Sequence, residues 1–514
     1  MKKYIFLATL ALILATATTS CLRDTGTYDY RVLPPIEISN LVEAISQPRL
    51  SQLVLNPVVT QNGSDGNLTF EWRLRDDLSV PDPLLGYFIN RVIGTSADLD
   101  FLLDVPSRRY HLALYVTDQT TGLIVSHRIS LNVESLVSPG LMVFHGSSTS
   151  GDVSIVANPL INAIIPGFTE DFVRHNVFSE NNGRRTGGAP AAILHGTGAG
   201  LNFVYVFVKG ETGGYKLSVN DMTILGDYNS LFREPPATVN FQAVNMWNGG
   251  NRIVIMNDGN LHVSAQSDPA LFTPFSIASF GRDIQPAPFV GVGTGSIGGF
   301  YCTLSRRFMW VNNGAEINLY FDGPAASAFN PNNVDKEVVF SETGILNRWY
   351  VMMQEEGDPT TRQLYVMNLN MFPGGANNLV AVNLIDVSMN EGMSDARFFT
   401  IGQRGNARYH ATSTQIFSAG LESATATLIY DISTSFSGYE ITLMQLFKEF
   451  NGWPPAQATP NCSRLLFVGI YNSGTQSGKL LQFQVNEHDG TLIYPQPVVY
   501  EGFERIKAIA YKKI

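Results

Sequence analysis

From residue 36 onward, hydrophobic and polar residues alternate over short stretches that are separated by glycine, asparagine, serine or threonine. Tyr110 to Val116 is one such stretch, and Thr117 and Asp118 end it. A period of two predicts β-strands with one buried face and one polar face, and the intervening residues predict tight turns. Long helical patterns are nearly absent. The pattern therefore predicts an all-β protein.

Residues 36–135 have the regular strand spacing of an antiparallel β-sandwich. Glu71 to Leu74 is a predicted strand that carries Trp72, a side chain large enough to fill a small sandwich core. Thr121 and Gly122 form a predicted turn into a further strand, Ile124 to Val133. We expect one face of this sheet to be buried and the other to be solvated.

Residues 139–514 follow a different rhythm, in which hydrophobic strand pairs recur after the break at Ser138-Pro139-Gly140. The second strands start near 153, 214, 260, 316, 363, 427 and 479, at spacings of 46 to 64 residues. Such spacing is typical of β-propeller blades. Seven units fit best, and six or eight stay open. The alternative is a second and third sandwich, but one continuous rhythm without a linker favours a closed ring, which removes exposed sheet edges. The clearest pairs are 202–208 with 214–219, 252–256 with 260–265, 308–311 with 316–321, 349–353 with 363–367, and 465–470 with 479–485.

The two ends of this region each look like an incomplete blade. Ile506 to Tyr511 reads as an innermost strand with nothing after it to complete a unit, and Leu141 to Phe144 opens the region without an inner partner. We predict that these two strands pair and close the ring.

Residues 1–20 read as a segment that is removed. Lys2 and Lys3 precede an apolar run from Tyr4 to Ala15, and small residues lead to Cys21. This is a secretory signal that is too short for a spanning helix. It resembles a bacterial lipoprotein signal, whose cysteine becomes the acylated first residue. The alternatives are an uncleaved anchor and an ordinary secretory peptide. Residues 21–35 form a tether, and by the sorting rules of lipoproteins the sequence Leu22-Arg23-Asp24 favours the outer membrane; the leaflet stays open.

Composition narrows the classes of partner. Hydrophobic residues make up 44% of the chain and charged residues 15%, and the net charge is −10. An acidic chain argues against nucleic-acid binding. Cys302 and Cys462 remain after the lipid site, and we predict that both are buried and that they are not bonded to each other, because they belong to units on opposite sides of the ring.

The strand with Trp72, followed by the strand from Tyr110 to Asp118, resembles an immunoglobulin-like PKD domain. Together with the start from Cys21 to Tyr30 and the repeated strands that follow, the chain resembles the PKD-like family of lipoproteins. The resemblance implies a gene neighbourhood of outer-membrane nutrient-uptake transporters and their lid lipoproteins. The shared motifs are structural, so the resemblance supplies no functional residue.

No motif carries a specific chemistry. His145, His175, His195, His262 and His410 fall in the propeller, but none has a metal-ligand spacing, and we predict no metal and no cofactor. His195 follows the apolar run 191–194 and could reach the central channel. The glycine-rich run 291–296 lacks the Gly-Lys-Ser/Thr ending of a phosphate-binding loop, and no G-x-S-x-G motif of a serine nucleophile occurs. Asp386 with Glu391, or Glu355 with Glu356, could act as an acid–base pair only if the fold brings the two carboxylates together; otherwise they are ordinary surface carboxylates.

Two tryptophans near turns offer a binding hypothesis. Trp247 precedes Asn248-Gly249-Gly250, and Trp453 precedes Pro454-Pro455. Such rings can stack on a glycan or on peptide side chains, although packing inside the protein is the more common role. Trp247, Trp453 and His195 are the candidate ligand-binding residues.

The sequence thus favours a non-catalytic, surface-exposed outer-membrane lipoprotein that binds a nutrient or docks on a transporter and its lid lipoprotein. Whether it is an enzyme stays open. The alternative is a propeller-based hydrolase or lyase that acts on polysaccharide or peptide, which would place several titratable side chains at one mouth of the channel. A third possibility is an assembly factor without a ligand.

Overall fold

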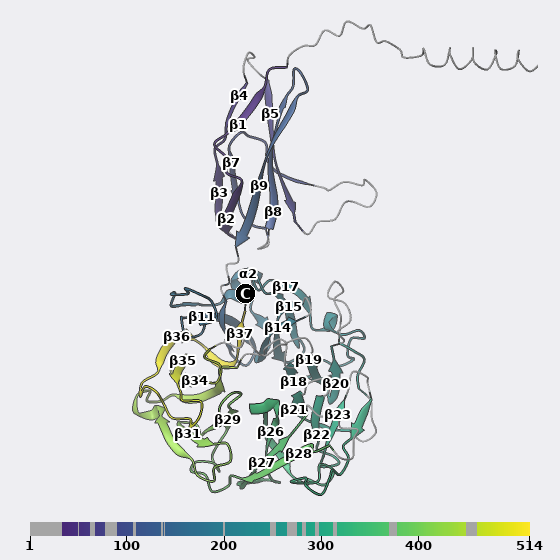
Figure 1. Ribbon diagram of the computed structural model, residues 1–514, viewed down its shortest axis with the longest axis vertical. Helices are drawn as coiled ribbons and strands as arrows, with labels where there is room; N and C mark the ends of the chain where they lie inside the picture. Colours follow the sequence, from purple (N-terminus) through teal and green to yellow (C-terminus); the bar gives the residue numbers. More distant parts are fainter. Residues whose placement is uncertain are drawn as a thin grey trace, which may run out of the picture. The chain divides into compact units, whose positions relative to one another are not determined.

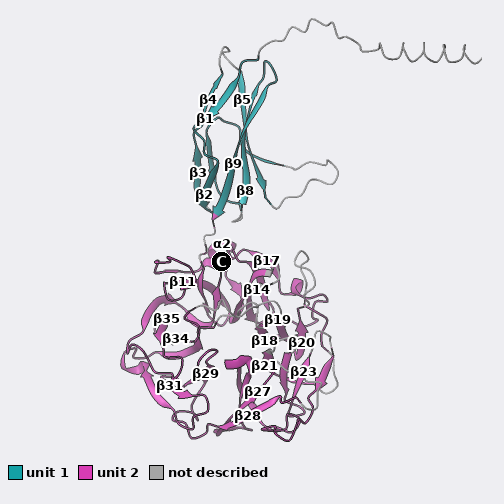
Figure 2. Ribbon diagram, in the orientation of Figure 1, with its two compact units in different colours: residues 1–133 teal, residues 134–514 magenta. Residues whose placement is uncertain are grey.

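The computed structural model divides the chain into two compact units, residues 1–133 and residues 134–514 (Figure 2). The structure describes residues 33–49, 51–61, 67–77, 90–105, 109–134, 137, 139–198, 201–246, 253–264, 275–279, 284–292, 298–311, 316–369, 378–448 and 460–513.

The first unit is an antiparallel β-sandwich of the immunoglobulin-like class. Its largest sheet has the strand order β2-β9-β8-β5-β6, and the order of the two smaller sheets is β1-β4 and β3-β7. The strands are β1 (Ile36–Ser39), β2 (Ala44–Pro48), β3 (Gln52–Leu55), β4 (Val58–Gln61), β5 (Leu68–Asp76), β6 (Arg91–Gly94), β7 (Leu99–Leu102), β8 (Arg109–Asp118) and β9 (Ile124–Glu134).

The core of this unit forms around Trp72, as predicted. Trp72 is fully buried, and its indole N–H donates a hydrogen bond to the carbonyl of Ala97 over 3.1 Å. Leu112, Leu114 and Leu131 pack in the same cluster. The C-terminal half of β9 alternates strictly between buried and exposed residues, which confirms the prediction of one core-facing and one solvated face.

The described residues of the second unit form seven antiparallel sheets, and Figure 1 shows them arranged around a common centre. The second unit is therefore a β-propeller. The first blade contains β10 (Gly140–Gly146), β11 (Ser150–Ala157), β12 (Phe172–Arg174), β13 (Thr186–Gly187) and β37 (Arg505–Lys512). The second to fourth blades are β14 (Ala189–Gly198), β15 (Leu201–Lys209), β16 (Gly214–Ser218) and β17 (Ile224–Asp227); β18 (Phe241–Met246), β19 (Ile253–Asn257) and β20 (Asn260–Val263); and β21 (Pro286–Val292), β22 (Gly298–Cys302), β23 (Arg307–Val311) and β24 (Ile317–Leu319).

The remaining three blades are regular four-stranded meanders. They are β25 (Glu337–Thr343), β26 (Trp349–Glu355), β27 (Asp358–Met367) and β28 (Ala381–Asp386); β29 (Phe398–Ile401), β30 (Ala407–Ala411), β31 (Gln415–Gly420) and β32 (Thr427–Asp431); and β33 (Glu440–Leu446), β34 (Leu465–Asn472), β35 (Ser477–Gln484) and β36 (Val498–Phe503).

The described helical segments are short. The helix α2 (Val177–Asn182) ends at Gly183, whose φ of 65° is a left-handed conformation that glycine adopts without strain. Three single turns of 3-10 helix are η1 (Asn229–Leu231), η2 (Ile345–Asn347) and η3 (Ile432–Thr434).

The ring closes as the sequence predicts. The last strand, β37, pairs antiparallel with β10, and Leu141 lies opposite Tyr511 in the register. Ile506 and Ile509 of β37 are buried in a cluster shared with β10 and the seventh blade. The first blade is therefore built from both ends of the propeller region, and the pairing covers an edge of β10 that would otherwise be exposed.

Two details of the predicted repeat were wrong. The pair predicted at 308–311 and 316–321 forms the third and fourth strands of its blade, because the preceding strand β22 was not recognised. The strand pattern also places each cysteine at the end of a short strand just before a predicted pair, and this is wrong for one of them, since Cys302 ends β22 whereas Cys462 lies in a turn before β34. Both thiols are nevertheless buried and free, which confirms the prediction that they are not bonded.

Candidate functional site

The innermost strands of four blades line an open cavity of about 310 Å³. Each of the strands β14, β18, β33 and β37 stands at one end of its sheet, so each has a strand partner on one side only. Residues of all four strands line the same cavity, which places it at the centre of the ring. We call it the central cavity. Its lining residues are Ala191, Ala192, Ile193, Leu194, His195, Val244, Asn245, Met246, Gln445, Lys448, Lys507, Ala508, Ile509, Ala510, Tyr511 and Lys513.

Small side chains keep the central cavity open. Alanine occupies positions 191 and 192 on β14 and positions 508 and 510 on β37. An alanine projects only a methyl group, so at these four positions the strand edges themselves form much of the wall. The wall thus combines polar strand edges and polar side chains with apolar side chains, and polar groups of this kind can fix the orientation of a small molecule.

The charged groups of the lining are all lysines. Lys507 lies on β37 and Lys513 follows it, whereas Lys448 follows β33. The Lys507 side chain is exposed, and it makes no hydrogen bond or ion pair with any residue that the structure describes. Partial burial lowers the pKa of its ammonium, and the nearby Arg505 lowers it further. Lys507 is therefore a cation with an unused hydrogen-bonding capacity at the cavity.

Lys448, by contrast, is tied into a buried network with Glu342. Its Nζ lies 2.7 Å from Glu342 Oε2 and donates to the carbonyl of Thr343 over 2.9 Å. Burial lowers the pKa of Lys448, and the carboxylate of Glu342 opposes that shift. Glu342 also accepts hydrogen bonds from Thr400 Oγ1 and from the backbone N–H of Ile401. One carboxylate thereby joins the inner strands of three consecutive blades.

His195 lines the central cavity, as the sequence suggested, but both of its ring nitrogens are used within the fold. Nδ1 accepts a hydrogen bond from the backbone N–H of Lys513 over 3.0 Å. The proton must therefore lie on Nε2, which donates to Asn202 Oδ1 over 2.6 Å. Burial lowers the pKa of His195 to about 4, and Lys512 and Lys513 contribute in the same direction. At neutral pH the ring is uncharged, and it fixes the end of the chain onto the second blade.

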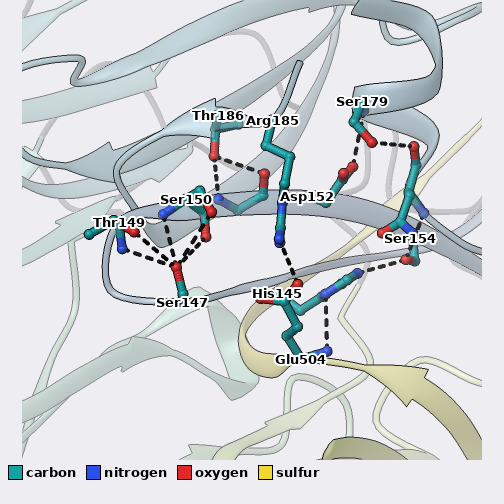
Figure 3. Close-up of polar contacts among 12 residues, drawn as sticks. His145, Ser147, Thr149, Ser150, Asp152, Ser154, Ser179, Arg185, Thr186 and Glu504 are labelled. Carbon is teal, nitrogen blue, oxygen red and sulfur yellow. Dashed lines mark hydrogen bonds and ion pairs between the residues drawn. The ribbon is translucent and has the colours of Figure 1, made fainter. Parts of the chain in front are cut away.

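A second group of polar residues surrounds His145 in the first blade (Figure 3). His145 Nε2 lies 2.7 Å from Ser154 Oγ, and both side chains are buried. Asp152 is also buried and accepts hydrogen bonds from the backbone N–H groups of Val153 and Ser179. Histidine, serine and aspartate so close together raise the question of a catalytic triad.

The direction of the hydrogen bonds excludes that role. His145 Nδ1 accepts from the backbone N–H of Glu504, so Nε2 carries the proton and donates it to Ser154. Ser154 Oγ also accepts from the backbone N–H of Asn176. A general base must accept the serine proton, and here the histidine supplies one instead. Burial lowers the pKa of His145 to about 3, so the ring is a poor base as well.

The network has a structural role instead. Glu504 directly precedes β37, and its carboxylate forms an ion pair with Arg185 over 2.7 Å (Figure 3). Through His145 and Arg185, the start of β37 is fastened to two segments at the other end of the propeller sequence.

The other candidates from the sequence are likewise engaged in packing or in ion pairs. His262 is buried against Phe232, and its ring nitrogen Nδ1 bonds to the carbonyl of Ser276. His410 stacks on Phe417 and donates to the carbonyl of Glu391.

The suggested carboxylate pairs are not acid–base pairs. Glu355 contacts Lys336, Glu356 contacts Arg306, and Asp386 accepts hydrogen bonds within its own turn. These three carboxylates therefore each have a separate partner.

Three predicted site residues, Cys21, Trp247 and Trp453, lie outside the described residues, as does most of the run 291–296. Within the described ranges, no group of three histidine, cysteine or acidic residues is placed to hold a metal ion. In the same ranges, no helix is long and apolar enough to cross a membrane.

Sequence reasoning missed the lysines of the central cavity. Lys448 and Lys507 are 59 positions apart in the sequence, and neither belongs to a recognisable motif. The one available signal was the prediction that Ile506 to Tyr511 is an innermost strand, because a lysine on an innermost strand lies near the channel.

The comparisons with known proteins concern the fold. Residues 21–190 match the model of the PKD-like family, a range that takes in the sandwich and the strands β10 to β13. The chain is also similar to a quinonprotein alcohol dehydrogenase-like protein from Bacteroides thetaiotaomicron, with 11% identity over 92% of this chain and 97% of the other and a TM-score of 0.43. A DUF4784 family protein from Bacteroides caccae has 10% identity over 78% of this chain and 97% of its own, with a TM-score of 0.35.

The Dos1 propeller has 9% identity over 78% of this chain and 83% of its own, with a TM-score of 0.37. No curated protein matches the chain. At these identities and TM-scores, the structural likenesses carry no inference about function.

Proposed function

We propose that this protein is a non-catalytic, lipid-anchored binding component of a nutrient-uptake complex at the surface of the outer membrane. The observation that carries the proposal is the central cavity, which is walled by the innermost strands of four blades and lined by alanines and a few polar groups. Ligand sites are typically concave, and polar side chains in their walls fix the orientation of the ligand.

The arrangement of the chain suits this role. Cys21 would carry the lipid, and two or more acyl chains give a stable anchor. A tether and a sandwich of about 100 residues then separate the propeller from the anchor in the sequence. The resemblance to the PKD-like family points to an outer-membrane transporter and its lid lipoprotein as partners, and to a glycan or peptide as the ligand.

A hydrolase or lyase is the alternative, and it is less well supported. Such an enzyme needs an acid and a base that face the substrate. Among the described lining residues, the histidine has both ring nitrogens engaged, and the charged groups are lysines. A binding role needs no acid or base that faces the ligand, only charged and hydrogen-bonding groups such as these lysines.

The anchor is tested by membrane fractionation of a Cys21→Ala variant. We expect this variant to accumulate as uncleaved precursor or as soluble protein. Cys302→Ala, which alters a buried thiol in the fourth blade, is the matched control and should fractionate like the wild type. Normal processing and membrane partitioning of Cys21→Ala would refute lipid attachment at this residue.

The binding role is tested by two measurements on the full chain. Affinity purification from membranes should recover an outer-membrane transporter, and a thermal-shift screen with glycans and peptides should raise the melting temperature, because a ligand stabilises the state that it binds. Cleavage of a polysaccharide or peptide by the purified protein would favour the enzymatic alternative instead.

A further inference from the structure

We propose that the central cavity takes an organic oxyanion, meaning a ligand that carries a carboxylate or phosphate group, and that Lys507 receives the anionic group. This inference rests on the proposed function, because it assigns a chemical class to the ligand of the same cavity. Four observations lead to it.

First, the charges of the protein are segregated. The chain has 44 acidic residues against 34 lysines and arginines, yet the described lining of the central cavity contains three lysines and no aspartate or glutamate. An acidic protein that collects only cations around one cavity creates a local positive potential inside a negative molecule. Clefts lined by one sign of charge concentrate ligands of the opposite sign.

Second, the carboxylate that neutralises Lys448 does not neutralise Lys507. Glu342 is committed to Lys448, to Thr400 and to the backbone of Ile401. Lys507 has no hydrogen bond or ion pair with a described residue. His195 adds no negative charge, since it is neutral and its ring nitrogens are engaged. The cavity therefore retains a net positive charge.

Third, hydrogen-bond donors accompany this charge. β14 and β37 each leave one edge without a strand partner, and both line the cavity. The N–H groups on such an edge are available to an anion. Gln445 adds a half-buried side-chain amide that has no hydrogen bond to any described residue. An oxyanion needs several donors beside a cation, and this wall supplies them.

Fourth, Lys507 is only partly hydrated at the cavity wall. Burial lowers the pKa of its ammonium, which means that the charged form has lost part of its hydration without gaining a counter-charge. A bound anion would supply that counter-charge. The four alanines of the wall leave space for the uncharged body of the ligand beside the ammonium.

The test is calorimetric titration of the full chain in detergent with three probes of similar size: D-glucuronate, glucose 6-phosphate and D-glucose. We expect at least one of the two anions to bind at least tenfold more tightly than glucose, and the affinity to fall as salt is added. The two anions distinguish a carboxylate site from a phosphate site.

The variants are Lys507→Gln, which removes the charge at similar size, and Lys507→Arg, which keeps it. Lys507→Gln should weaken binding of the anion at least tenfold and should reduce the salt dependence, whereas Lys507→Arg should retain most of the affinity. The matched control is Lys479→Gln on β35, where the lysine pairs with Glu501 and does not line the cavity. It should bind the anion like the wild type.

If neither anion binds more tightly than glucose, or if the anion affinity of Lys507→Gln is undiminished, the inference is overturned. These results differ from a failure of the proposed function. If a neutral glycan or a peptide raises the melting temperature and a transporter is still recovered from membranes, the binding role stands and only the anionic class of the ligand is wrong.

Discussion

Acidification from pH 7 to pH 5 should strongly destabilise the propeller, because three of its histidines are buried as neutral rings. His145, His195 and His410 are each no more than 4% exposed. Burial lowers the pKa of His145 to about 3 and the pKa values of the other two to about 4.

The neighbouring charges reinforce this shift. Each ring lies near basic side chains, whose positive charge disfavours protonation of the histidine. These neighbours are Arg185 and His175 for His145, Lys512 and Lys513 for His195, and Arg408 for His410. A group whose pKa is lower in the folded than in the unfolded state binds its proton first in the unfolded chain. Its contribution is therefore fully present above the unfolded pKa of 6.5 and is lost as the pH falls from 6.5 toward 4 or 3.

The magnitude follows from the interval between the unfolded pKa and the test pH. One pKa unit corresponds to about 1.4 kcal/mol, so at pH 5 each histidine costs about 2 kcal/mol and the three together about 6 kcal/mol. Domains are typically stable by about 5–15 kcal/mol. The predicted loss is therefore a large part of the stability of the propeller.

The assay is guanidinium unfolding at pH 7, 6 and 5, with His145→Gln and His410→Gln. A glutamine amide can still donate to Ser154 or to the carbonyl of Glu391 but cannot be protonated in this range. Each variant should reduce the loss between pH 7 and pH 5 by about 2 kcal/mol, whatever its stability at pH 7.

His488→Gln is the matched control, because the His488 side chain is 80% exposed, and its pH dependence should equal that of the wild type. Stability that does not change between pH 7 and pH 5, or an equal slope in His145→Gln, would refute the reasoning.

Two further predictions concern the closure and the joints of the ring. Deleting residues 505–514 removes β37 with its buried Ile506, Ile509 and Tyr511. This loss of buried apolar surface should lower the free energy of unfolding by about 5 kcal/mol or more and lower the melting temperature of the whole propeller. Removing residue 514 alone is the control, and an unchanged melting temperature after the longer deletion would contradict closure by β37. Glu342→Gln leaves the Lys448 ammonium buried without its carboxylate and should cost about 3 kcal/mol in guanidinium unfolding. Adding Lys448→Met should recover most of that loss, and a Glu342→Gln variant as stable as the wild type would show that the ion pair is not a joint between blades.

The sequence by itself determined the elements that local patterns encode. Alternation and turn residues identified the strands of the sandwich, the burial of Trp72, and most of the strand pairs of the propeller, because side-chain direction in a strand repeats every two residues wherever one face is buried. It also identified the closing strand at Ile506 to Tyr511, because an incomplete blade at each end of the repeat region predicts that the first and last strands pair with each other. Strand β22 escaped notice because its glycines and aromatic residues, Gly298 to Cys302, do not alternate.

Only the tertiary structure decided the site. The central cavity is assembled from four blades whose strands are up to 322 positions apart, Ala191 to Lys513, and no local pattern records which inner edges meet at the centre. Lys507 and Lys448 look alike in the sequence, yet Glu342 neutralises one and leaves the other facing the cavity. His195 was placed correctly at the channel, but its partners Asn202 and Lys513 determine that its ring supports the fold. Charge and hydrogen-bond capacity at a site depend on what remains unpaired after folding, and that balance is set by contacts between distant segments.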